Sequence, residues 1–277
     1  MERLCRRVAG AAGLVCSVAA APAIAGDGGG SLLSELFPEG LPVPFEAVLD
    51  RLRAEAGATN VQAALVPLGR SLQRYAAAPE YFAAPRIVVA VTGDAAAGPG
   101  APRLGDRLFL GYAPAAEMIE AISYDETAGH FVFEEVVGYG AADATVEPAE
   151  RRVCLRCHQG EGPIFARPLW SESNANPAIA ARLAPLGASF HGAPVAQTVD
   201  GLAAFDAATD RAARAAVARR LWTEGCGEAA CRAVLLDSAV RVALGGAPMA
   251  PGPPPAGFER RATATGSPTS PPEARDP

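Results

Sequence analysis

The feature that most constrains the fold of this chain is a change of residue pattern near residue 145. Before it lie four short runs rich in β-branched and aromatic residues, namely Ile87–Val91, Leu108–Tyr112, Ile119–Tyr124 and Phe131–Val137. Such runs favour strands, because these side chains pack well on a pleated surface. The segment Asp125–Gly129 has the length and the glycine of a hairpin loop between the last two strands. Alanine-rich segments follow, so we predict an α+β fold, with a β-rich N-terminal part before a mostly helical part.

Helices are predicted on both sides of the strand region. The candidate segments, chosen for apolar residues at helical spacing or for high alanine content, are residues 43–56, 61–75, 177–183, 200–222 and 228–244. Pro67 should break or kink the second of them, because proline removes a helical hydrogen bond. Asn174 or Asn176 can cap the third, which has Pro177 in its first turn. A break near 209–210 could divide the fourth.

The first 25 residues have the pattern of an export signal. They begin with Arg3, Arg6 and Arg7, continue through the small and apolar run 8–21, and end with Ala23-Ile24-Ala25. A charged start, a short apolar stretch and an Ala-x-Ala site are typical of a cleavable secretory signal. The apolar stretch is shorter than the roughly 20 residues that span a bilayer. We therefore predict that the mature chain is periplasmic or otherwise exported, without a transmembrane anchor.

The rest of the chain divides by composition. Residues 26–145 should form a mixed region with short antiparallel strands, and residues 146–250 a helical region. Residues 251–277 are rich in proline and polar side chains, which predicts a disordered tail. The signal holds three arginines and one glutamate, so the formal net charge of −6 becomes −8 after cleavage. This acidic balance argues against a nucleic-acid partner, which would require a basic face.

Four of the six cysteines have simple interpretations. Cys5 and Cys16 lie in the predicted signal and would leave with it. Cys226 and Cys231 form a nearby pair, and in an oxidising compartment such a pair is expected to form a disulfide. A redox-active pair is the alternative interpretation of the same spacing.

The other two cysteines belong to the run Cys154-Leu155-Arg156-Cys157-His158. This run resembles the haem-attachment motif of c-type cytochromes, and the resemblance is local, covering roughly residues 150 to 170. It implies one covalent haem c per chain, with the two thiols bonded to the haem and the imidazole of His158 as an axial ligand of the iron. Residues 146–250 would then be a helical, cytochrome c-like haem-bearing region.

Three other interpretations of the motif remain open. A structural zinc site could combine Cys154, Cys157 and His158 with Cys226 or Cys231, although such sites usually draw a second ligand pair from a matched spacing. A thioredoxin-like dithiol would need a strand before the motif and a helix that begins inside it. A plain disulfide between the two motif cysteines is the third possibility.

A second element of the resemblance follows the motif. In c-type cytochromes a Gly-Pro pair after the axial histidine supplies a carbonyl that accepts a hydrogen bond from the outer ring nitrogen. Gly162-Pro163-Ile164 is similar to that element, although the intervening loop is shorter than in most members of the family. The resemblance implies that Pro163 orients His158, which would leave Nε2 for the iron and raise the basicity of the ligand.

The sixth position of the iron is ambiguous in the sequence. His191, in a glycine-flanked irregular segment, is one candidate, and Met249, held between prolines, is the alternative. His130 and Met118 are more simply surface or core residues. An open or water-bound position is the remaining possibility, and the three choices differ in redox potential and in reactivity toward small molecules.

These features lead to three functional hypotheses. The first is an exported monohaem c-type protein that transfers one electron to or from a redox partner protein in the periplasm. The second is a haem enzyme with an open iron site, similar to a peroxidase. The chain is more than twice the size that a simple carrier needs, which favours this second hypothesis slightly. The third is a haem-based sensor or interaction protein.

Overall fold

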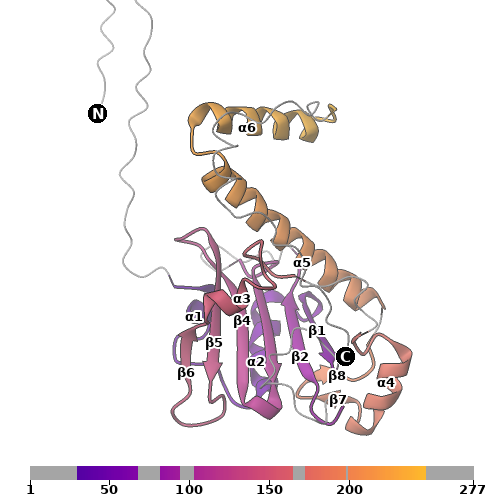
Figure 1. The fold of residues 1–277 in the computed structure, drawn as a ribbon. Coiled ribbons are helices and arrows are strands. Elements are labelled where there is room, and N and C mark those ends of the chain that lie inside the picture. Colours follow the sequence, from indigo (N-terminus) through magenta and orange to yellow (C-terminus); the bar gives the residue numbers. More distant parts are fainter. Residues whose placement is uncertain (1–29, 68–81, 94–102, 165–171, 198, 248–277) are drawn as a thin grey trace, which may run out of the picture.

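Six antiparallel strands form one sheet whose spatial order follows the sequence, from β1 to β6 (Figure 1). The structure is a computed structural model, which describes residues 30–67, 82–93, 103–164, 172–197 and 199–247. The strands are β1 (Val61–Val66), β2 (Arg86–Val91), β3 (Leu108–Ala113), β4 (Met118–Asp125), β5 (His130–Val137) and β6 (Thr145–Pro148). The predicted signal, the proline-rich tail and Met249 lie outside the described residues.

One face of the sheet is covered by helices α1 (Leu32–Leu36) and α2 (Phe45–Ala56). Every second residue of each strand points to this face, and cross-strand partners share it. Tyr112, for example, pairs with Ile119, which in turn pairs with Val136. These residues and the apolar side of α2 form the main hydrophobic core.

The opposite face of the sheet is covered by the long helix α5 (Val199–Arg220) and by the segment that contains the short helix α3 (Arg151–Cys154). Helix α5 presents a stripe of small and aromatic residues to this face, made of Phe205, Ala208, Ala212 and Ala216. Because three of these are alanines, the helix can approach the strands and the neighbouring loops closely. Their partners on the sheet include Ala90, Phe109 and Phe131.

The chain after the motif returns to the far edge of the sheet. Helix α4 (Pro177–Leu183) begins at Asn176, whose side chain accepts a hydrogen bond from the backbone of Ala178. The small hairpin of β7 (Ser189–Phe190) and β8 (Ala193–Pro194) follows it, and Ala193 joins the main core. This part of the chain therefore covers the β1 side of the sheet.

Helix α6 (Ala229–Ala243) extends from the end of α5, away from the sheet (Figure 1). A π-helical turn (Leu221–Gly225) ends α5, and a disulfide between Cys226 and Cys231 connects this turn to the start of α6. Cys231 is the buried residue of α6, while Leu236, Val242 and other apolar side chains are exposed. Within the described ranges, no helix is both long and apolar enough to cross a membrane.

The observed fold is α+β, as the sequence predicts. The four predicted strands and the helices over 43–56, 177–183, 200–222 and 228–244 are present, and α5 continues without a break at 209–210. The predicted helix beginning at Val61 is wrong over its described part, because Val61–Val66 is strand β1. Ala63 and Leu65 are buried in the main core and pair with β2, so tertiary pairing outweighs the helical spacing there. Strand β6 was not predicted.

Candidate functional site

The short helix α3 follows strand β6 and leads into the motif. Glu150 caps helix α3 by accepting a hydrogen bond from the backbone of Arg152, and α3 ends at Cys154. The carbonyl of Cys154 then accepts hydrogen bonds from the backbone N–H groups of Cys157 at 3.2 Å and His158 at 2.9 Å. The five motif residues therefore form one tight turn that continues the helix, and the sheet determines where this turn begins.

His158 is oriented by a loop that directly follows it. Its Nδ1 lies 2.8 Å from the carbonyl oxygen of Gly162. A carbonyl only accepts, so Nδ1 carries the proton and Nε2 of the neutral ring has the free lone pair. The ring lies beside Phe133, with 5.4 Å between centroids. Burial lowers the pKa of His158 below its ordinary value, which favours the neutral form that binds metals.

Charged residues of the sheet lie close enough to influence the motif electrostatically. Arg86 and Glu120 form an ion pair, with 11% and 23% of their side chains exposed, on the face that α3 covers. Burial raises the pKa of the Cys154 thiol, and the carboxylates of Glu120 and Glu135 raise it further. Gly111 makes the ion pair sterically possible, because a Cβ at this position would overlap the guanidinium of Arg86.

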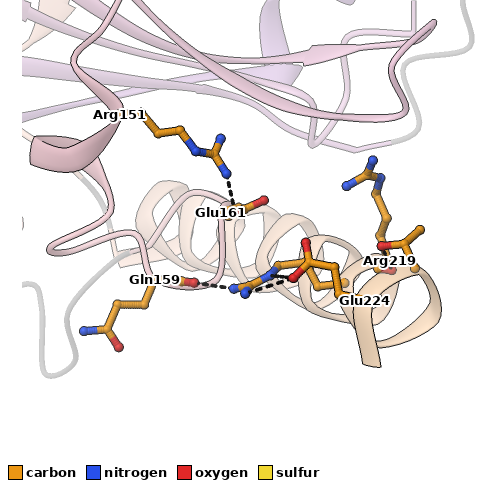
Figure 2. A network of polar contacts seen from close by, with 7 residues as sticks. Arg151, Gln159, Glu161, Arg219 and Glu224 are labelled. Carbon is orange, nitrogen blue, oxygen red and sulfur yellow. Dashed lines mark hydrogen bonds and ion pairs between the residues drawn. The ribbon is translucent and has the colours of Figure 1, made fainter. Parts of the chain in front are cut away.

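The loop after His158 is connected to both the motif helix and the end of α5 (Figure 2). Glu161 pairs with Arg151 at 2.5 Å, and its backbone N–H donates to the carbonyl of His158 at 2.8 Å. On the other side, Arg220 donates to the carbonyl of Gln159 at 2.6 Å and also reaches Glu224 at 3.3 Å. The loop is thus fixed between two helices rather than extended into solvent.

The two motif thiols are free, with Cys154 half-buried and Cys157 exposed. A zinc site that borrows Cys226 or Cys231 does not fit this structure, because those two thiols are bonded to each other. Within the part of the chain that the structure describes, no three His, Cys, Asp or Glu side chains converge on a possible metal position. A thioredoxin-like dithiol is also disfavoured, because Cys154 ends a helix and lacks the N-terminal helix dipole that would stabilise its thiolate.

Pro163 was the predicted partner of His158, but the accepting carbonyl belongs to the residue before it, Gly162. Pro163 itself is buried. The short loop accounts for the difference of one residue: it turns at Glu161, which has a φ of 60°, and brings the Gly162 carbonyl back toward the imidazole.

His191 lies on the other face of the sheet from His158. Its ring is 5.4 Å from that of Tyr112, and its Nδ1 is 3.6 Å from Glu46 of α2. Phe133, which contacts His158, pairs with Ile122 on the α5 face instead. The structure therefore does not bring the two histidines together, and in this arrangement they cannot bind opposite sides of one iron.

The remaining candidates for the sixth position are dispersed. Met118 is buried with Ala113 at the end of the β3–β4 pairing. His130 opens strand β5 and lines a small pocket with Glu161 and Arg219 at the end of α5. Met249 lies outside the described residues.

Several site residues were missed from the sequence. Phe133 and Glu120 were predicted only as strand residues, and Arg86 lies just before the predicted strand Ile87–Val91. The alternation of β4 indicates that Glu120 shares a face with Ile122, which could have drawn attention to it. The role of α5 against Gly162 had no signal in the sequence, because contacts between distant segments leave no local pattern.

Comparison with protein-family models, with curated proteins and with solved structures found no significant match to this chain.

Proposed function

We propose that this chain carries one haem c, bonded covalently through Cys154 and Cys157, with His158 as an axial ligand, and that it transfers single electrons. The observation that supports this most directly is the hydrogen bond between Nδ1 of His158 and the carbonyl of Gly162. It leaves Nε2 as the ligating atom and fixes the ring, as in metal-binding histidines. The haem iron would supply the one-electron redox couple.

The residues present are compatible with the group. Both thiols are free for thioether bonds, and the imidazole beside them is held in its neutral form by burial. The exposed thiol of Cys157 leaves one side of the turn accessible to a bulky group. The exposed apolar side chains Val153 and Ile164, which flank the motif, are 43% and 44% accessible and could pack on a macrocycle.

The sixth position decides between a carrier and an enzyme. A methionine or histidine ligand would favour electron transfer, and an open position would favour small-molecule chemistry. Since His191 lies on the opposite face of the sheet, Met249 and an open position are the alternatives to be tested. Replacement of Met249 by leucine should make the iron high-spin if the methionine is the ligand, whereas His191→Ala should leave the spectrum unchanged.

The decisive experiment is expression of the full chain together with the haem-attachment machinery, followed by acid extraction and mass spectrometry. We expect one haem to stay with the polypeptide after extraction, and reduced and oxidised spectra typical of haem c. The variant Cys154→Ser/Cys157→Ser should lose the covalent haem. Cys226→Ser/Cys231→Ser is the matched control and should keep it. Absence of covalent haem in the unaltered protein would contradict the proposal.

The same preparation distinguishes the carrier from the enzyme. A six-coordinate low-spin spectrum that does not respond to cyanide or peroxide supports one-electron transfer with a periplasmic partner. High-spin iron that binds both reagents supports a peroxidase-like site.

A further inference from the structure

We infer that helix α5 is the positioning element for the axial ligand: its alanine surface holds Gly162 at the place from which the Gly162 carbonyl orients His158. This inference rests on the proposed function. It gives helix α5, some 50 residues downstream of the motif, a role in setting the reduction potential of the iron.

The contact between the loop and the helix leaves little room for a side chain at Gly162. A Cβ built at this position would lie 3.1 Å from Cβ of Ala216, 3.3 Å from Cα of Ala213 and 3.6 Å from the carbonyl oxygen of Ala212. Two of these three atoms belong to the helix backbone and cannot rotate away. A side chain here would therefore push the loop and the helix apart by a few tenths of an ångström, so the close approach of the helix favours glycine although its φ is not left-handed.

Helix α5 is a rigid reference because the sheet holds it at several points. Arg211 makes two hydrogen bonds to Asp106 in the loop between β2 and β3, at 2.5 Å and 2.9 Å. Arg219 donates to the carbonyl of Ala128 in the β4–β5 hairpin at 3.4 Å. Phe205, 1% exposed, buries the N-terminal half of the helix against the strands.

The position of α5 therefore affects the orientation of His158 through a single backbone group, the carbonyl of Gly162. The carbonyl of Gly162 is displaced if the loop moves off the helix, and the N–H of His158 at Nδ1 then loses its acceptor. Outer partners of this kind orient ligating histidines and raise their basicity, and their loss typically weakens metal binding 10- to 100-fold. The iron potential should follow, because the electron donation of the imidazole to the oxidised iron decreases.

The direct test is Gly162→Ala. In the haem-free protein, ¹⁵N NMR should show a loss of the protected Nδ1–H signal of His158, or exchange with water that is at least about tenfold faster. In the haem-loaded protein the reduction potential should shift upward. Gly160→Ala is the matched control, because the nearest atom to its Cβ is Cγ2 of Val217 at 3.3 Å, a side-chain atom that can move.

Rescue separates positioning from a general structural defect. The double variant Gly162→Ala/Ala216→Gly removes the closest methyl group, so both the NMR signal and the potential should return toward the unaltered values. Ala216→Gly weakens the helix itself, so a rescue cannot come from added stability. If Gly162→Ala does not fold, Ala216→Val crowds the same contact from the helix side. It should give the same loss of the Nδ1–H signal and the same upward shift of the reduction potential.

Two outcomes would overturn the inference. One is a Gly162→Ala protein with an unchanged Nδ1–H signal and an unchanged potential. The other is a double variant that stays as perturbed as the single one. Because the NMR readout needs no haem, it tests the α5 contact even if the covalent attachment assay disproves the proposed function.

Discussion

Asn174 and Leu65 are joined by two hydrogen bonds that attach the chain after the motif to the edge strand β1. The N–H of Leu65 donates to Oδ1 of Asn174 at 3.0 Å, and the N–H of Asn174 donates to the carbonyl of Leu65 at 2.9 Å. The side-chain amide also donates to the carbonyls of Pro194 at 2.8 Å and Val195 at 3.0 Å. With 1% of its surface exposed, Asn174 completes the sheet edge with a side chain. The segment before the motif therefore lies in edge strand β6, and Asn174, after the motif, lies at the opposite edge strand β1.

We expect Asn174→Ala to lower the free energy of unfolding by about 3 kcal/mol, because it removes hydrogen bonds from three buried or partly buried backbone groups at about 1 kcal/mol each. Asn176→Ala, which removes the cap of α4, should cost about 1 kcal/mol. Urea unfolding of both variants measures the difference. Equal losses would show that the Asn174 amide does not hold the two segments together.

The ion pair of Arg86 and Glu120 should stabilise the sheet more than an exposed pair does. We expect Glu120→Gln to cost about 2 kcal/mol, because it weakens a charged hydrogen bond on a mostly buried arginine. Glu126→Gln is the control: it breaks the pair with Arg107, in which 31% and 45% of the side chains are exposed, and should cost less than about 1 kcal/mol. Urea unfolding at low and high salt would compare the two variants. A larger loss of stability in Glu126→Gln than in Glu120→Gln would contradict the prediction.

The two motif thiols should differ in reactivity in the haem-free protein. Cys157 is exposed, whereas Cys154 is half-buried and has a pKa raised by burial and by Glu120 and Glu135. Because the thiolate is the reactive form, iodoacetamide near neutral pH should modify Cys157 first, with Cys154 several-fold slower. Mass spectrometry of peptides sampled over time gives both rates. In Glu120→Gln the rate at Cys154 should increase while that at Cys157 stays constant.

The pH dependence of stability should carry a contribution from His158. Burial lowers its pKa in the folded haem-free protein, whereas the unfolded chain takes up a proton near pH 6.5. The unfolded state therefore binds more protons below that pH, and stability must fall as the pH drops from about 7 toward 5. In His158→Gln this part of the slope should disappear, which urea unfolding across the range would reveal. A slope that persists unchanged in His158→Gln would contradict this prediction.

The strands could be predicted because their β-branched and aromatic residues are concentrated in short runs between turn residues. The sequence predicts a helix over Val61–Val66 because its apolar residues also match helical spacing, whereas its strand character depends on pairing with β2. Strand β6 is short and exposed, with Glu147 and Pro148 in its sequence, so it carries little of the usual signal. Its pairing with β5 determines it instead.

The motif itself could be predicted from five adjacent residues, because its chemistry is local. The placement of His191 could not, since a glycine-flanked segment gives no indication of which face of a sheet it will join. Contacts of the neighbouring Gly192 with α2 determine the face on which His191 lies. Arg53 donates to the carbonyl of Gly192 at 3.0 Å, and a Cβ at Gly192 would lie 3.1 Å from Leu49. The contact of α5 with Gly162 is equally non-local.

The disulfide between Cys226 and Cys231 should stabilise α6 locally rather than the sheet. It closes a short loop, for which the chain-entropy model gives about 2 kcal/mol. The side chain of Arg232 supports the same junction by donating to the carbonyl of Cys226 at 2.9 Å. We expect Cys226→Ser/Cys231→Ser to accelerate hydrogen exchange along α6, because a 15-residue helix with mostly exposed side chains is marginal in isolation. Amides of β2 to β5 should keep their protection. If their exchange also accelerates, the junction stabilises the whole fold, and α6 is not the independent extension that its exposure indicates.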